Sequence, residues 1–362
     1  MDICHGSFHA LLLYDVADEI DLAGVRELLG ATPPGRKPEF KLPAPVYVRF
    51  ERPPVAEPSE TVLLSTGETF TGRLRYFDYG VVSFTLETEF QADWNGLIHV
   101  SNRWMDAPEL EQKALQIVRQ RVRSLTPAMR KPYAEWLDEV YYAVHVCEVH
   151  SSNGQISSAE MLTQYGGDIA RIVRGELKPL SPAEENEVLG SSMSYYPSDL
   201  LVVGWMAAFI YDTDEGAAAY IQLLEYANTQ LLEYRRYDEV LTRVLKHAYD
   251  TLERRGGILS RWKLASEANR LNTLRLDITE LSERTDNAIK FLSDMFYARA
   301  YGVASRKIGV NDYSHLVDEN LRTAGELYGF MVNDFRDART FVLELMVVII
   351  LIIEIVFLFR GK

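Results

Sequence analysis

The residues best suited to chemistry are few in this chain of 362 residues, and their densest group is His145, Cys147 and His150. They close the apolar run YYAVHVCEV at 141–149. If that run is a strand, His145 and Cys147 share one face while His150 lies on the other, so a three-ligand metal site requires a distorted strand. Packing is the simpler role. The chain's other cysteine is Cys4, and two cysteines cannot supply a four-thiolate zinc site. We therefore expect no metal and no cofactor.

Two carboxylates flank a second apolar run, DLLVVGWMAAFIY, which starts at Asp199 and is followed by Asp212. Paired carboxylates could do acid–base chemistry if the fold brought them together. Aspartates also cap the ends of strands without any such coincidence, so caps are the preferred interpretation. A membrane-bound hydrolase or transferase with a hidden site in this region stays open as the alternative.

Two further motifs fall short of a catalytic signature. Ser191, Ser192 and Ser194 have neither a neighbouring histidine nor a Gly-x-Ser-x-Gly setting. The pair Gly166-Gly167 lacks the remaining residues of a phosphate-binding loop and is typical of a turn or an irregular helix. No catalytic residue can be assigned, and we do not expect an enzyme.

The first 212 residues predict a mixed α/β domain. Apolar runs at 8–16 and 46–50, a three-strand meander at 61–90 and buried strands at 141–149 and 199–211 alternate with helices. The helices are expected at 22–29 with Asp21 as N-cap, at 107–125, and from Ser157 or Ser158 to Val173 before Gly175. A sheet with helices packed against it, in the α+β class, is the expected fold.

Residues 213–340 change to long helices with apolar positions three and four residues apart. This pattern runs from Tyr220 to Leu252, from Leu271 to Met295 and from Val317 to Leu345. A repeat near 3.5 residues predicts an antiparallel coiled-coil stalk. If the second helix, Ser260 to Ile308, lies antiparallel to the shorter third helix, Asn311 to Thr340, it reaches the surface of the membrane predicted below near Thr279. Its remaining residues are too polar to enter hydrocarbon, so the helix must bend, break or diverge there.

The C-terminal run 341–359, FVLELMVVIILIIEIVFLF, predicts a transmembrane helix, and a long helix of a soluble core is the alternative because the run is at the short end for a span. Seventeen of its nineteen residues are apolar, and a helix of this length spans about 28 Å, against a hydrocarbon thickness of roughly 30 Å. The first twenty residues contain no Lys or Arg, which fits neither a secretory signal nor a transit peptide. We therefore expect a single-pass C-terminal membrane anchor with the bulk of the chain in the cytoplasm.

The charge of the chain argues against nucleic acid as a partner. Lys and Arg number 38 and Asp and Glu 52, for a net charge of −14. Such a surface repels phosphates.

The C-terminal pattern from Arg339 through Leu343-Glu344 to Glu354 resembles the signature of the YagE-like family, also named for being required for meiotic nuclear division. The segment Tyr76–Phe84 is similar to that family's aromatic-Tyr-Gly-Val-Val strand. Residues 194–205 depart from the family's Ser-His and Ala-Gln-Ser segment, which indicates a divergent, bacterial-type member. The resemblance implies a membrane-associated organisational protein that forms oligomers, and it supplies no catalytic residues.

Together these features predict a membrane-anchored scaffold that forms homo-oligomers and holds a protein partner. Glu344 and Glu354 lie ten residues apart, broadly on one side of a helix. Together with Arg339 they are expected to form the membrane or oligomer interface. Within it, Glu354 is expected to lie at a helix–helix contact. The predicted hairpin tip combines cations with a tryptophan and is a candidate for anionic lipid headgroups, although an ordinary solvated tip is slightly favoured because charged tips are common in coiled coils. Its residues are Arg254, Arg255, Arg261, Trp262 and Lys263.

Overall fold

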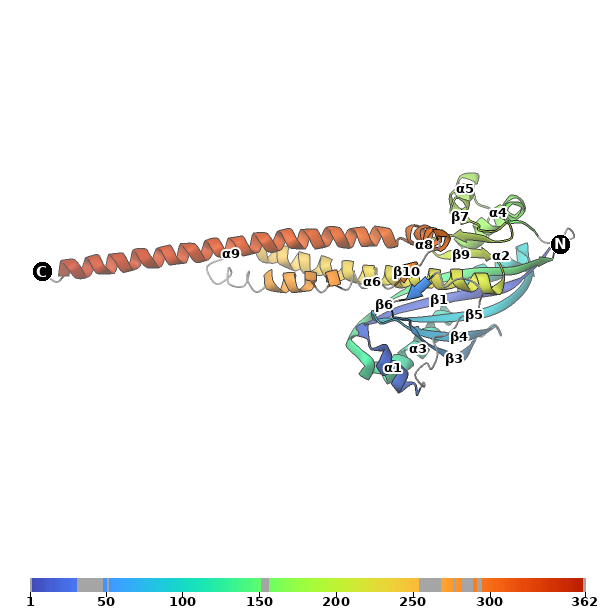
Figure 1. Ribbon diagram of the computed structural model, residues 1–362, viewed down its shortest axis with the longest axis horizontal. Coiled ribbons are helices and arrows are strands. Elements are labelled where there is room, and N and C mark those ends of the chain that lie inside the picture. The colour runs from blue at the N-terminus through green and yellow to red at the C-terminus, as the bar shows by residue number, and fades with distance from the viewer. Residues whose placement is uncertain are drawn as a thin grey trace. The chain divides into compact units, whose positions relative to one another are not determined.

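The computed structural model describes residues 2–30, 48–50, 52–150, 156–253, 268–276, 278–280, 289–291 and 295–360. The chain divides into two compact units (Figure 1). Unit 1 comprises residues 1–236 and 284–313, and unit 2 comprises residues 237–283 and 314–362. The expected boundary at 212/213 coincides with the start of the long helix α6 (Asp214–Glu253), whose first part belongs to unit 1.

Unit 1 is built on an eight-stranded sheet of order β3-β4-β5-β1-β6-β9-β8-β7. All of its neighbours are antiparallel except the parallel pair β6 and β9. A small second sheet pairs β2 (Val48–Phe50) with β10 (Ile289–Phe291). The strands of the large sheet are β1 (Ile3–Ile20), β3 (Val55–Leu63), β4 (Thr69–Tyr76), β5 (Val81–Asp93), β6 (Met129–His150), β7 (Ser192–Met193), β8 (Leu200–Val203) and β9 (Ala207–Tyr211).

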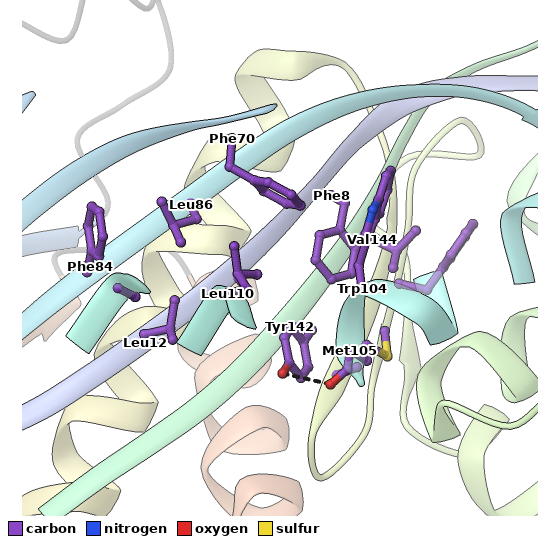
Figure 2. Close-up of a cluster of buried hydrophobic side chains, with 14 of the residues drawn as sticks. Phe8, Leu12, Phe70, Phe84, Leu86, Trp104, Met105, Leu110, Tyr142 and Val144 are labelled. Atoms are coloured by element: carbon purple, nitrogen blue, oxygen red, sulfur yellow. Dashed lines mark hydrogen bonds between the residues drawn. The ribbon is translucent and has the colours of Figure 1, made fainter. Parts of the chain in front are cut away.

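One face of this sheet carries the main hydrophobic core. Phe8 and Leu12 of β1 and Val144 of β6 pack there against Trp104 and Leu110 of the covering helices (Figure 2). Burial of aromatic and aliphatic area of this kind is the dominant stabilising term in folding. The helices of unit 1 outside α6 are α1 (Leu22–Leu28), α2 (Trp94–Met105), α3 (Pro108–Leu125), the 3₁₀ turn η1 (Thr126–Ala128), α4 (Ser158–Arg174), α5 (Pro182–Leu189) and α8 (Met295–Ile308).

The opposite face of the sheet is covered by α6. Every residue from Leu223 to Tyr234 is buried, so three turns of this helix have no solvent-facing side. Tyr301 of α8 lies 6.0 Å from Tyr226 between ring centroids and covers the helix from outside. Because this stretch of α6 is buried on all sides, its polar residues need hydrogen-bond partners inside the protein.

Local capping signals determine several helix ends. Asp21 caps α1 by accepting from the Ala23 N–H. Ser157 and Glu160 form a capping box at the start of α4, and Gly175, with a φ of 65°, ends it. These three sequence predictions are confirmed, as are the meander of β3, β4 and β5 and the helix at 108–125.

Two predicted elements are wrong in detail. The apolar run 199–211 is not one central strand but a hairpin, because Gly204 begins a turn that reverses β8 into β9. The second long helix breaks, as predicted, but the break lies at β10 and not near Thr279: β10 separates the helical residues 268–276 and 278–280 from α8. Both faces of this hairpin are buried, so its sequence lacks the alternation of apolar and polar residues that would have indicated two separate strands.

Unit 2 contains the end of α6, the helical residues 268–276 and 278–280, and α9 (Val310–Arg360) from Ser314 onward. Its described part of α6 runs in the same direction as α9 (Figure 1), and Asn320 Nδ2 donates to Asp238 Oδ1 at 2.9 Å. Its core is small: the fully buried members are Leu245, Ala248, Ala268, Leu271, Ala324, Leu327 and Met331.

The helix predicted at 341–359 is the end of α9, but it is not a membrane span. Among the described residues, no helix is long and apolar enough to cross a membrane. The described side chains of this segment run from Val342 to Val356, and charges at Glu344 and Glu354 leave nine uninterrupted apolar residues, about 14 Å of helix against a bilayer core of roughly 30 Å. This finding overturns the predicted transmembrane helix and the predicted single-pass membrane-anchored localisation.

Candidate functional site

A chain of three buried polar side chains crosses the α6 side of the sheet. Ser7 Oγ lies 2.9 Å from His9 Nε2 and 3.1 Å from His145 Nδ1. His145 Nε2 lies 2.9 Å from the main-chain oxygen of Asp212. Ser7, His9 and His145 retain exposed fractions of only 8%, 6% and 3%. A serine bonded to a histidine whose other nitrogen is held in place is the arrangement that nucleophilic catalysis uses.

The strand register explains why these residues meet. Ser7 and His9 are two residues apart on β1 and so share a face, and Ser7 pairs directly with His145 of β6. The β1–β6 register shifts between His5 and Gly6. Gly6 is required there, because a Cβ on it would lie 1.8 Å from the His145 carbonyl oxygen. This irregularity brings the two strands, and hence the Ser7 and His145 side chains, close together.

The hydrogen-bond partners assign the protons. The Asp212 carbonyl can only accept, so His145 Nε2 carries a hydrogen, and in the neutral imidazole Nδ1 is then an acceptor. The Ser7 hydroxyl therefore donates to His145 Nδ1 and accepts from His9 Nε2–H. Burial, with the neighbouring His145, lowers the pKa of His9 from 6.5 to about 3, so His9 is neutral near pH 7.

The carboxylates of Asp199 and Asp212 lie at the same end of the β8–β9 hairpin, since Leu200 pairs with Tyr211. Asp199 is buried and accepts from the Tyr195 and Tyr196 N–H groups at 2.7 and 2.9 Å. Burial raises the pKa of Asp212, which accepts from the Thr213 N–H at 2.7 Å. Both carboxylates thus cap main-chain N–H groups, as the preferred sequence interpretation had it.

The other sequence candidates are separate from this chain of polar groups. Cys147 is exposed, and its thiol donates to the His5 carbonyl oxygen at 3.3 Å. Ser191 Oγ donates to main-chain carbonyls, and Gly166 and Gly167 lie inside α4 facing side chains of α5. Within the part of the chain that the structure describes, no group of His, Cys, Asp and Glu could hold a metal ion.

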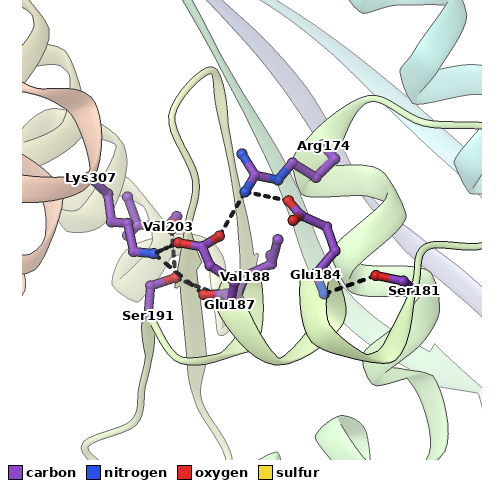
Figure 3. Close-up of polar contacts among 8 residues, drawn as sticks. All are labelled: Arg174, Ser181, Glu184, Glu187, Val188, Ser191, Val203 and Lys307. Atoms are coloured by element: carbon purple, nitrogen blue, oxygen red, sulfur yellow. Dashed lines mark hydrogen bonds and ion pairs between the residues drawn. The ribbon is translucent and has the colours of Figure 1, made fainter.

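An ion-pair network joins α8 to the helices beside the sheet. Glu187 of α5 accepts from Arg174 of α4 and from Lys307 of α8, and Arg174 also pairs with Glu184 (Figure 3). Lys307 lowers the pKa of Glu187. The network uses its charges internally, so we assign it a structural role.

The end of α9 presents the other unusual surface. Twelve large apolar side chains between positions 343 and 356 are each 45% to 56% exposed. Glu344 and Glu354 are exposed among them, whereas the side chain of Arg339 lies outside the described residues. The twelve are Leu343, Leu345, Met346, Val347, Val348, Ile349, Ile350, Leu351, Ile352, Ile353, Ile355 and Val356.

The five residues predicted to contact lipid headgroups also lie outside the described residues, so that contact stays a prediction. They are Arg254, Arg255, Arg261, Trp262 and Lys263.

The architecture defines an α+β protein whose mixed sheet is covered by a long central helix on one face. The family model described as "Uncharacterized protein MJ0711, N-terminal domain" matches residues 5–218, more than half of the chain, and the chain belongs to this family. The uncharacterized protein MJ0711 of Methanocaldococcus jannaschii is 19% identical over 188 residues, which cover 52% of this chain. The alignment spans 58% of that relative, less than two thirds of its length. No solved structure matches the chain.

This family replaces the YagE-like assignment, which is wrong. The strongest part of that resemblance, from Arg339 to Glu354, lies outside the matched residues 5–218. Unrelated chains can share an apolar helical run that contains two glutamates. The spacing of Glu344 and Glu354 was therefore weak evidence of homology. The Tyr76–Phe84 segment comprises the last residue of β4, the turn at 77–80 and the start of β5, where hairpin geometry favours such residues.

Proposed function

We propose that this protein is an assembly scaffold, in which the end of α9 joins copies of the chain and unit 1 is the head that each copy presents to a protein partner. The observation that carries the proposal is the apolar surface from Leu343 to Val356. Soluble proteins rarely leave a contiguous apolar surface of this kind in water unless it binds something.

The pattern of α9 favours other copies of the chain as the occupant. Its heptad-like stripe begins in the part of the helix where Ala324 and Met331 are buried against other helices of unit 2. The same helix continues without interruption to Arg360. Identical chains bring identical segments, which can bury one another in a closed symmetric assembly.

The distribution of apolar residues also bears on the number of copies. They occupy consecutive positions from Leu345 to Ile353, so they surround the helix instead of forming one seam. A helix that is apolar all round needs neighbours on several sides. We therefore expect three or more chains in the assembly, with the side carrying Glu344 and Glu354 at a helix–helix contact.

The mass of the purified full-length chain in mild detergent, measured by light scattering, tests assembly directly. The double change Ile349→Asp and Ile353→Asp should reduce the assembly to single chains. Leu316→Asp is the matched control, because Leu316 is an equally exposed apolar residue earlier on α9. A single-chain mass for the unchanged protein contradicts the proposal.

Cysteine cross-linking locates the contact. In a Cys147→Ser background, Ile350→Cys should give disulfide-linked pairs on mild oxidation, whereas Leu316→Cys should not. Equal cross-linking at both positions would indicate collision instead of assembly. Glu354→Gln and Glu354→Leu then test the glutamate: if neither changes the assembly's mass, Glu354 does not lie at the contact.

A further inference from the structure

Unit 1 contains a serine placed as nucleophiles are placed in acyl transfer. The Ser7 hydroxyl is directed at His145 Nδ1 at 3.1 Å, and His145 is oriented by the Asp212 carbonyl at 2.9 Å. The two contacts are the nucleophile–base and base–orienter bonds by which such sites are recognised, although a carbonyl replaces the usual carboxylate. His9 adds a third contact, because its Nε2–H points at the attacking atom.

The backbone at this point is specialised to make the arrangement. Ser7 follows the register shift at Gly6, where a side chain would collide with the main chain of His145 itself. His145 and Asp212 are brought into range by separate elements, β6 and the residue that follows β9. A buried serine needs only one partner to be satisfied, whereas Ser7 has two histidines, one on each side of its oxygen.

We propose that Ser7 is a nucleophile and His145 its general base in an acyl-transfer site that hydrolyses small neutral carboxylic esters. This activity goes beyond the scaffold function and does not depend on it. Ser7 and His9 are only 8% and 6% exposed, so the substrate of such a site must be small. A charged substrate would lose its hydration in so buried a place, which disfavours an anionic ester.

The reaction balances with water as the only co-reactant. Ser7 Oγ forms a bond to the ester carbonyl carbon while its proton moves to His145 Nδ1. The C–O bond to the alcohol then breaks, and the alcohol leaves with that proton. Water attacks the acyl-Ser7 carbonyl and gives a proton to His145, which returns it to Ser7 Oγ as the carboxylic acid is released. The imidazolium formed in each half keeps its Nε2–H bond to the Asp212 carbonyl.

A fluorophosphonate probe on the full-length protein tests the nucleophile without any substitution. Mass spectrometry should find the probe on Ser7. Labelling should be lost in the folded His145→Gln variant and retained in Ser83→Ala, which removes a fully buried serine of the neighbouring strand β5. If Ser7 of the unchanged, folded protein stays unlabelled at millimolar probe, the proposal is overturned whatever the variants do.

The proposed activity is measured as the rate at which the protein hydrolyses p-nitrophenyl acetate. All proteins in this experiment carry Cys147→Ser, because the exposed thiol could itself attack the ester. Ser7→Ala and His145→Gln should each lower the rate roughly 100-fold or more, and Ser83→Ala should leave it unchanged. A folded Ser7→Ala protein, checked by circular dichroism, that keeps the full rate contradicts the proposal.

Discussion

The two units treat polar and apolar side chains in opposite ways. In unit 1 the helix α6 is buried all round from Leu223 to Tyr234 and carries polar groups into the interior, where Glu225 and Thr229 have partners on the sheet side. In unit 2 the core is small, and α9 exposes apolar side chains from Leu343 to Val356. Unit 1 is therefore organised around internal pairing, whereas unit 2 leaves apolar side chains exposed.

Internal pairing in unit 1 involves charges on α6 and on the sheet. Arg75 of β4 pairs with Glu225, which is 1% exposed, and Arg236 pairs with Asp15, also 1% exposed. Tyr79 and Thr229 share a buried hydrogen bond of 2.8 Å. Such pairs are weak evidence of net stability, but losing one partner leaves the other buried and uncompensated. They fix how α6 sits on the sheet.

The largest effect should come from breaking one of these pairs. Arg75→Ala leaves the Glu225 carboxylate buried without its cation and should cost about 3–5 kcal/mol in the free energy of unfolding. Arg243→Ala removes the exposed ion pair with Glu239 in unit 2 and should cost less than about 1 kcal/mol. Urea unfolding of the full chain gives both values, and equal losses would erase the distinction between the units.

A matched pair of leucines compares the two cores. Leu12 and Leu271 are each 1% exposed, one in the large core of unit 1 and one in the small core of unit 2. We expect Leu12→Ala to cost about 4 kcal/mol and Leu271→Ala about 2–3 kcal/mol, because the helices of a small core can move to fill the cavity. Hydrogen exchange should show the loss confined to the unit that carries the change. A larger loss at Leu271 contradicts this comparison.

The neutral histidine inside unit 1 predicts a dependence on pH. Burial lowers the pKa of His9 from 6.5 to about 3, so the unfolded chain binds a proton in that window and the folded chain does not. Stability that is present above pH 6.5 should therefore fall as the pH drops, by up to about 1.4 kcal/mol per unit from this group. The slope of unfolding free energy against pH should be shallower in His9→Asn. The exposed His99→Asn serves as the control, and an unchanged slope in His9→Asn would exclude the effect.

What the sequence could predict was mostly local. The capping box at Ser157 and the left-handed Gly175 lie next to the ends of α4 in the sequence, so both signals can be recognised from neighbouring residues alone. The β8–β9 hairpin was missed because both of its faces are buried, which leaves Gly204 as its only mark. The interruption of the second long helix at β10 depends on pairing with β2, far away in the chain.

The Ser7 site was missed for a similar reason. The predicted strand began at Phe8, so Ser7 was left outside it, and His145 was considered only with its neighbours in sequence. Ser7 and His145 are 138 residues apart, and only the sheet register joins them. One local signal was available: Ser7 and His9 alternate directly after Gly6 in an otherwise apolar run. Polar residues on one face of a buried strand require partners there.

The smallest expected effect tests whether unit 2 is as loosely constrained as its exposed surface suggests. Gly329 lies inside α9, and a Cβ added there would meet nothing within 4 Å. Glycine costs a helix interior roughly 0.5–1 kcal/mol relative to alanine because the unfolded chain has more freedom to lose. Gly329→Ala should therefore stabilise unit 2 by about that amount, seen as slower hydrogen exchange along α9. Gly6→Ala, the counterpart in unit 1, should destabilise the sheet because its side chain meets the His145 carbonyl. If Gly329→Ala instead destabilises unit 2, then α9 is packed against a neighbour at that position, and the contact between copies extends further along the helix than Leu343.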